Sequence, residues 1–258
     1  MLLIIACTVV SATAQHYIGV RGGWGGGSAR FKPNQETGME WGLPSGGISY
    51  KFYGNTKFVG GVQIDLQYLG RGFMYDIKKD SDTSYHRTIS SIDLPIMWQP
   101  HAYIFQRHAR FFINLGVTFS YNLTSKEYMK SKEKGKFYER DYHFGVTRDN
   151  RVGYGLCGGV GLSVFIKRFE IAAEGRYYFG YSDILKNKTK YETNPLRSPL
   201  DNINISMALY YRLSKEGIRS APSKATVRRM MEAEAKRTLK KIEKNGNRER
   251  IDAPTEDR

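Results

Sequence analysis

Few of the side chains that could carry catalysis or hold a metal lie at useful spacings in this sequence. The histidines are His16, His86, His101, His108 and His143. His143 follows Asp141 by two residues, as in the Asp–His pair that a hydrolase could use, but this spacing is frequent by chance. No CxxC, HExxH or calcium-loop spacing occurs. We therefore expect no catalytic residues, no metal, no cofactor and no enzymatic activity.

Cysteine chemistry is limited by number. The chain has two cysteines, and Cys7 lies in an apolar N-terminal run. If that run is removed as a signal peptide, Cys157 is the only cysteine left and no internal disulfide can form. Because Leu156 and Gly158 flank Cys157, we expect this thiol to be a small packing residue.

Seven charged residues occupy the polar positions of segments in which polar and apolar residues alternate. They are Asp65, Asp93, Arg110, Glu170, Glu174, Arg176 and Arg212. If these positions face an enclosed interior, each charge needs a partner there, because an unpaired charge in a low dielectric is costly. We therefore expect a polar network of paired carboxylates and arginines inside the fold.

The elements that position these charges are strands, because the alternation has a period of two. Two segments interrupted by glycines bring the number of alternating segments to eight. The segments are 16–24, 41–53, 58–68, 92–98, 111–123, 152–166, 169–179 and 203–213. The short connections 54–57, 100–109 and 167–168 alternate with the long ones 25–40, 71–87, 124–151 and 182–201. This pattern predicts an all-β fold, an eight-stranded antiparallel up-and-down barrel.

The composition of the polar face indicates which side of the strands is inside. A soluble barrel of the lipocalin type would show a solvated exterior rich in Lys and Glu. Here the polar face consists mainly of Gly, Ser, Asn, Thr and Gln, which suits a narrow interior. The apolar face is therefore expected to contact outer-membrane lipid, which makes this a transmembrane barrel.

Aromatic residues lie near the ends of the expected strands. One set is expected at the periplasmic ends: Phe52, Phe58, Trp98, Phe111, Phe169 and Tyr211. The other set, at the opposite ends, is Tyr68, Tyr121 and Tyr181. Two such girdles are typical of the membrane interfaces of a bacterial barrel.

The ends of the chain differ from the middle. Residues 1–14 combine an apolar run with a small-residue cleavage pattern and are expected to be a signal peptide. Residues 15–213 would form the barrel. Residues 214–258 are basic and partly helical in pattern, and we expect a helical or disordered periplasmic tail that could bind a periplasmic or outer-membrane protein. The net charge of +15 is concentrated in this tail and in connections, so we expect no nucleic-acid partner.

Five segments resemble a known family, the PorT-like outer-membrane β-barrel domain common in Bacteroidota. They are residues 17–23, 66–72, 92–96, 158–162 and 174–178, and the likeness spans residues 15–213. The resemblance implies an eight-stranded barrel in the cell outer membrane. One class of its members assists type IX protein secretion, so the resemblance also implies a role as an accessory of that system. The tail after Leu213 is longer than the family pattern.

These observations lead to three hypotheses on function. The first is a non-enzymatic structural or assembly component that makes contacts through surface loops and tail. The second is the secretion accessory. The third is a surface-loop module for an anionic ligand, suggested by the lysines at 126, 130, 132, 134 and 136, although the acids at 127, 133 and 139 fit a plain solvated hairpin better. A pore is not expected, because side chains fill an eight-stranded barrel.

Overall fold

The computed structural model describes residues 15–33, 36–53, 60–77, 82–105, 108–131, 133, 135–187 and 195–214. The expected signal peptide (1–14), Phe58 and the tail from residue 215 onward lie outside the described residues. Among the described residues, no helix is long and apolar enough to cross a membrane.

The described chain consists of ten strands joined by turns and loops. They are β1 (Gln15–Ala29), β2 (Glu40–Tyr53), β3 (Gly61–Asp76), β4 (Thr83–Gln99), β5 (His101–Ile104), β6 (Ala109–Ser131), β7 (Gly135–Tyr142), β8 (Val152–Ile166), β9 (Phe169–Asp183) and β10 (Pro199–Arg212).

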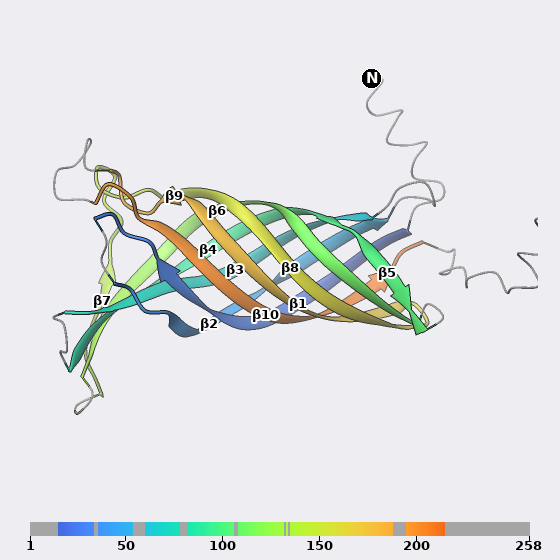
Figure 1. Cartoon of the computed structure of the whole chain (residues 1–258), viewed down its shortest axis with the longest axis horizontal. Helices are drawn as coiled ribbons and strands as arrows, with labels where there is room; N and C mark the ends of the chain where they lie inside the picture. The colour runs from blue at the N-terminus through green and yellow to red at the C-terminus, as the bar shows by residue number, and fades with distance from the viewer. Residues whose placement is uncertain are drawn as a thin grey trace, which may run out of the picture. The chain divides into compact units, whose positions relative to one another are not determined.

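Eight of these strands close into a barrel (Figure 1). The order runs β4-β3-β2-β1-β10-β9-β8-β6, and pairing of β4 with β6 completes the ring. Every pair is antiparallel, and the first and last strands meet in one ladder, from Tyr17 opposite Arg212 to Ala29 opposite Leu200. The predicted eight-stranded up-and-down barrel is confirmed.

Side chains alternate between the interior and the outer surface, as the sequence pattern predicts. On β6, Asn114 is fully buried while its neighbours Ile113 and Leu115 are 38% and 50% exposed. On β3, Asp65 is fully buried between Ile64 and Leu66, which both face outward. The polar face is therefore inside, and the apolar face forms a belt around the barrel.

All four expected long loops are wrong in part, because strands continue into them, and the difference is largest in two of them. Residues 71–87 contain the ends of β3 and β4, and residues 124–151 contain the end of β6 and all of β7. Residues 70–76, 83–90, 124–131 and 135–142 together form an extension that we call the outer sheet. Figure 1 shows it projecting from the end of the barrel that carries β7. The alternation of residue types stops here because the outward face beyond the lipid meets water and no longer has to be apolar, whereas the backbone ladder persists.

The expected turn at residues 100–109 also contains a strand. Pro100 has no N–H, so the ladder is interrupted after β4. The chain continues as β5, which pairs with the beginning of β6. It takes the same edge of β6 with which β4 pairs from Leu115 onward.

The two ends of the barrel differ in their connections. At one end, β8 and β9 are joined by Lys167 and Arg168 alone, and β1 begins where β10 finishes. We call this the turn end and the opposite end, with the outer sheet, the loop end. In bacterial barrels the short turns face the periplasm.

Candidate functional site

The centre of the barrel is occupied by a four-membered ion cluster, which we call the central cluster. It consists of Arg21, Asp65, Glu174 and Arg176, from β1, β3 and β9, and each side chain is at most 1% exposed. Asp65 Oδ2 lies 2.6 Å from a guanidinium nitrogen of each arginine. Arg176 Nη2 lies 2.6 Å from Glu174 Oε1, and Arg21 also pairs with Glu174. Each charge therefore has two partners of opposite sign.

A second buried group lies towards the turn end. Glu170 accepts hydrogen bonds from Arg110 at 2.5 Å and from Lys51 at 3.1 Å. The Lys51 ammonium lies 3.7 Å from the centre of the Tyr210 ring, and the Arg110 guanidinium lies 4.1 Å from that of Tyr53. Cation–π contacts of this kind compensate for part of the lost hydration of a buried cation.

A third ion pair lies on β3 and β4. Asp93 pairs with Arg71 and accepts a 2.7 Å hydrogen bond from Ser91. Nearer to the outer sheet, Glu40 accepts a hydrogen bond from the hydroxyl of Tyr128, and its Oε2 lies 2.5 Å from His86 Nδ1. Polar contacts thus continue along the interior.

Apolar clusters lie at both ends of these ion groups. At the turn end, the rings of Tyr17, Tyr53, Phe112 and Tyr210 pack together. At the loop end the buried cluster is Ala29, Phe73, Ile89, Ile184 and Leu200. Cys157 is buried in a third cluster with Leu69, Met97 and Tyr178. The polar centre is therefore enclosed, which excludes water from the ion pairs and strengthens them.

The structure brings six of the seven expected interior charges into ion pairs. Asp65, Glu174 and Arg176 share the central cluster, Glu170 pairs with Arg110, and Asp93 pairs with a residue not foreseen. Arg212 differs from the other six. Its side chain is buried at the last position of β10, opposite Tyr17, and it makes no ion pair with a described residue.

Three Arg or Lys side chains of these ion pairs were not expected from the sequence. They are Arg21, Lys51 and Arg71. Arg21 and Lys51 lie on the two strands interrupted by glycines, whose alternation is weak. Arg71 follows the last clear alternation of β3 and was assigned to a loop. Their positions could have revealed them, because each lies an even number of residues from an inward-facing residue of the same strand and therefore faces the same side.

The expected aromatic residues that the structure describes lie on the outward positions. Tyr68, Trp98, Phe111, Tyr121, Phe169, Tyr181 and Tyr211 are between 37% and 47% exposed, and Phe52 is half-buried. The rings of Phe169 and Tyr211 meet edge to face with centroids 5.4 Å apart. Trp24 and Trp41, which are 66% and 64% exposed, also face outward and were not anticipated.

The strands of the outer sheet are held together by aromatic and charged contacts. Arg87 Nε donates a 3.0 Å hydrogen bond to Ser125, and its guanidinium lies 3.6 Å from the centre of the Tyr142 ring. Tyr142 in turn donates to Asp149 at 2.8 Å. Tyr85 donates to Glu127 at 2.6 Å, and burial together with this bond raises the pKa of Tyr85. These phenols therefore remain protonated donors at neutral pH.

The lysines of the suspected anion-binding hairpin are partly neutralised. Lys136 lies 2.7 Å from Glu139, and Lys126 lies 3.9 Å from the same carboxylate. Glu127 pairs with Arg140. The lysines at 132 and 134 lie outside the described residues. In the described part of the hairpin, positive and negative side chains lie next to one another, as is usual on a hairpin exposed to water.

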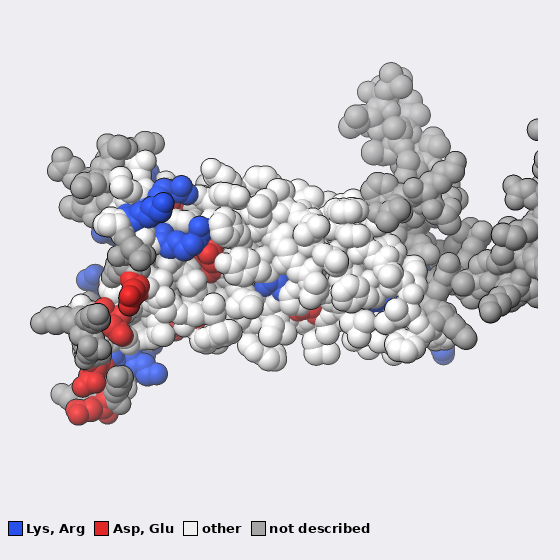
Figure 2. Space-filling model, viewed as in Figure 1, with Lys and Arg blue, Asp and Glu red and all other residues white. Residues whose placement is uncertain are grey.

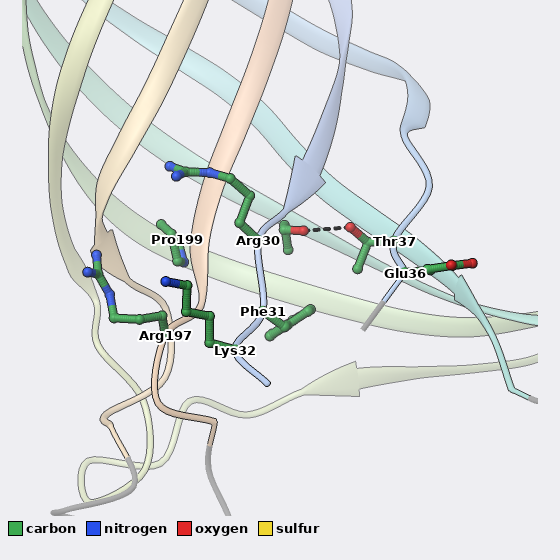
Figure 3. Close-up of a pocket in the computed structure, with 8 residues that line it drawn as sticks. Arg30, Phe31, Lys32, Glu36, Thr37, Arg197 and Pro199 are labelled. Atoms are coloured by element: carbon green, nitrogen blue, oxygen red, sulfur yellow. Dashed lines mark hydrogen bonds between the residues drawn. The ribbon is translucent and has the colours of Figure 1, made fainter. Parts of the chain in front are cut away.

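A pocket of about 550 Å³ opens at the rim of the loop end. Its lining residues are Ala29, Arg30, Phe31, Lys32, Glu36, Thr37, Arg197 and Pro199 (Figure 3). We call it the rim pocket. Thr37 donates a 2.5 Å hydrogen bond to the carbonyl oxygen of Ala29, which holds the β1–β2 connection against the end of β1. Within the described part of the chain, no three His, Cys, Asp or Glu side chains are placed to hold a metal ion.

The family model of the outer membrane protein beta-barrel domain matches residues 13–186. The chain belongs to this family. The outer membrane protein beta-barrel is thus located in the cell outer membrane, with its apolar belt in contact with lipid. No curated protein matches the chain.

Several solved outer-membrane barrels are similar to this family member at low identity. Ail, the attachment invasion locus protein of Yersinia pestis, is 12% identical, with 78% of this chain and 97% of Ail covered and a TM-score of 0.34. Neisserial surface protein A is 11% identical, with coverage of 76% and 96% and a TM-score of 0.35. The N-terminal barrel domain of Pseudomonas aeruginosa OprF is 11% identical, with coverage of 78% and 100% and a TM-score of 0.35.

Proposed function

We propose that this protein is a non-enzymatic structural or assembly component of the outer membrane that makes its contacts outside the barrel. The observation that carries the proposal is the enclosed interior. The side chains of the central cluster and of Glu170, Lys51 and Arg110 are at most 1% exposed. Lys51 and Arg110 lie against rings of the apolar cluster at the turn end, and a second apolar cluster lies at the loop end. A barrel filled in this way does not conduct solutes, because its lumen is occupied by side chains.

The outer sheet is the surface best suited to a partner. It extends the ladder of β3, β4 and β6 beyond the belt, and β7 lies along the edge of β6. Phe137 and Tyr138 on β7 are 53% and 40% exposed. A rigid barrel that carries an exposed strand can offer main-chain and aromatic contacts to another protein. The tail at 214–258 remains a second proposed contact.

The test compares membranes that contain three forms of the protein. In the first variant, residues 126–140 are replaced by Asn-Gly. The second variant ends at Leu213, and the third form is the intact chain. Partners are recovered in mild detergent and identified. Loss of a partner in either variant, with the barrel still folded by its heat-dependent mobility on gels, supports the proposal. An unchanged partner set in both variants, or steady solute conductance of the intact protein in planar bilayers, contradicts it.

A role as an accessory of type IX secretion is the second proposal, supported by the PorT-like segments. One of them, residues 174–178, contributes Glu174 and Arg176 to the central cluster. Deletion of the gene should then leave secreted cargo in the periplasm, and the intact chain should restore export. Normal export without the protein contradicts this role. A module for anionic ligands on the hairpin receives less support, because Lys126 and Lys136 already pair with Glu139.

A further inference from the structure

The rim pocket is bordered by three cations that face away from the barrel axis. The ladder of β1 and β10 keeps one register, and it continues past Ala29 into a bridge between Lys32 and Arg197. Positions two apart share a face, so the outward series on β1 that begins at Trp24 reaches Arg30 and then Lys32. The cations therefore lie directly beyond the lipid-facing belt. Figure 2 shows Lys and Arg gathered at this margin, next to a long surface with few charges.

Lys32 and Arg197 carry like charges at directly opposed positions of the ladder. Opposed side chains in an antiparallel pair have Cβ atoms about 4.5–5.5 Å apart, and like charges there destabilise the pair. Asp183 neutralises Arg197, since both carboxylate oxygens lie 3.1 Å from Arg197 Nε. Lys32 makes no ion pair with a described residue. Among the described residues, Lys32 is thus the rim cation that no carboxylate pairs with, and Glu36 also lines the pocket.

The two arginines are held in place but keep donors for a ligand. Arg30 forms a two-point contact with Asp201, with Nε 2.8 Å and Nη2 3.1 Å from its oxygens, and it lies 4.0 Å from the Phe179 ring centre. Arg197 Nη2 donates to the carbonyl oxygen of Tyr181 at 3.0 Å. The Arg30 and Arg197 side chains are 44% and 48% exposed. A guanidinium has five N–H donors, so each can still bind an anionic oxygen.

The simplest other explanation is that the arginines only neutralise carboxylates near the lipid. Asp201 is an outward-facing carboxylate covered by Arg30, and Asp183 is paired with Arg197. This accounts for both arginines. It does not account for Lys32, which carries the same charge as Arg197 and lies directly across the ladder from it. The Lys32 side chain extends towards Pro199, at the margin of the pocket (Figure 3). Lys32 is therefore the residue that separates the two explanations.

We propose that Arg30, Lys32 and Arg197 bind a phosphate group on the headgroup of an outer-leaflet glycolipid. The cations are at headgroup level because the apolar belt ends below them, and basic clusters at that level attract anionic headgroups. A pocket of about 550 Å³ is large enough for a phosphorylated sugar. Glu36 and Thr37, on the other side of the pocket, offer oxygens to sugar hydroxyls (Figure 3). The acyl chains would lie along the belt.

The experiment measures binding to the full-length protein in detergent micelles. The probes are bisphosphorylated lipid A, the same lipid without its phosphates, phosphatidylglycerol and inorganic phosphate. Lys32→Gln removes one charge from the rim, and Lys126→Gln removes one from the outer sheet as the matched control. We expect Lys32→Gln to weaken binding of bisphosphorylated lipid A roughly tenfold, because a charge-assisted contact is lost. Lys126→Gln should bind it as the wild type does.

Four outcomes would overturn the proposal. They are unchanged affinity in Lys32→Gln, equally tight binding of phosphate-free lipid A, equally tight binding of phosphatidylglycerol, and saturation by inorganic phosphate alone at the same concentration. Thermal unfolding without lipid gives an independent readout. Lys32→Gln should unfold at the same or a higher temperature than the wild type, because it removes the positive charge that repels Arg197. A lower unfolding temperature would contradict the repulsion on which the site depends.

Discussion

Arg176 Nη1 donates a 2.6 Å hydrogen bond to Asp65 Oδ2, and the two residues are 111 positions apart in the sequence. Their strands, β9 and β3, are separated in the ring by β10, β1 and β2. The bond therefore crosses the interior of the barrel rather than running along its wall. Arg21 on β1 contacts the same oxygen, so one carboxylate connects three strands.

Asp65→Asn should destabilise the barrel strongly. It leaves Arg21 and Arg176 with Glu174 alone, and breaking a buried ion group by removing one member costs about 3–5 kcal/mol. The measurement is urea unfolding in detergent. Glu139→Gln, which removes an exposed carboxylate of the outer sheet, is the control and should leave the unfolding midpoint unchanged. Equal midpoints for the two variants would show that the central cluster adds little to stability.

Glu170 pairs with both Lys51 and Arg110, so replacing Glu170 should cost more stability than replacing one of its two partners. Glu170→Gln leaves the buried cations Lys51 and Arg110 without a counter-charge, whereas Lys51→Met leaves Glu170 paired with Arg110. Glu170→Gln should therefore cost at least about 1 kcal/mol more than Lys51→Met. The same unfolding assay measures both variants. A larger loss in Lys51→Met would mean that the cation–π contact with Tyr210 outweighs the ion pair.

Two glycines of the barrel wall should respond differently to alanine. A Cβ at Gly116 would overlap the Ile96 carbonyl oxygen and lie 2.7 Å from the Met97 Cα, so the β4–β6 ladder would have to shift. A Cβ at Gly175 would meet nothing within 4 Å. We expect Gly116→Ala to reduce the yield of folded barrel and Gly175→Ala to leave it the same or slightly higher. Folded yield is read from the heat-dependent gel shift, and equal yields would contradict the crowding at Gly116.

Arg87 should control the order of the outer sheet without affecting the barrel. Its contacts with Ser125 and the Tyr142 ring are lost in Arg87→Ala. Trypsin should then cleave the hairpin at Lys136 or Arg140 faster, while the urea midpoint of the barrel changes little. Ser84→Ala, on the same strand of the sheet, serves as the control. Unchanged cleavage in Arg87→Ala would show that the β4–β6 ladder alone holds the hairpin.

The half-buried phenol of Tyr85 should ionise at unusually high pH. Burial and the hydrogen bond to Glu127 raise its pKa. A raised folded pKa means that its contribution to stability is complete below pH about 10, the value of a free tyrosine, and is lost as the pH rises further. In a titration of tyrosinate absorbance, the component missing in Tyr85→Phe should be the one that ionises late. A missing component near pH 10 would contradict the effect.

The alternation of residue types was enough to predict the eight strands of the ring and the direction of their faces. Residues that face lipid must be apolar, whereas residues that face the narrow interior can be polar or small. Ile64 and Asp65 therefore already show which side of the strand faces the lipid. The same demand places Phe169 and Tyr211 on the outward face. The strands and the direction of their faces depend on neighbours along the chain and on the surrounding medium, so the sequence pattern is enough to predict them.

Only the tertiary structure decided which charges meet. Asp65 finds Arg21 and Arg176 because ring closure places three strands around one point, and no local pattern encodes that distance. The missed Arg71 and Arg212, which pairs with no described residue, have the same cause, since pairing depends on height along the barrel axis. The outer sheet was not foreseen because its outward face meets water instead of lipid, which removes the alternation of residue types while the backbone ladder continues. The opposition of Lys32 and Arg197 likewise exists only because the first and last strands join.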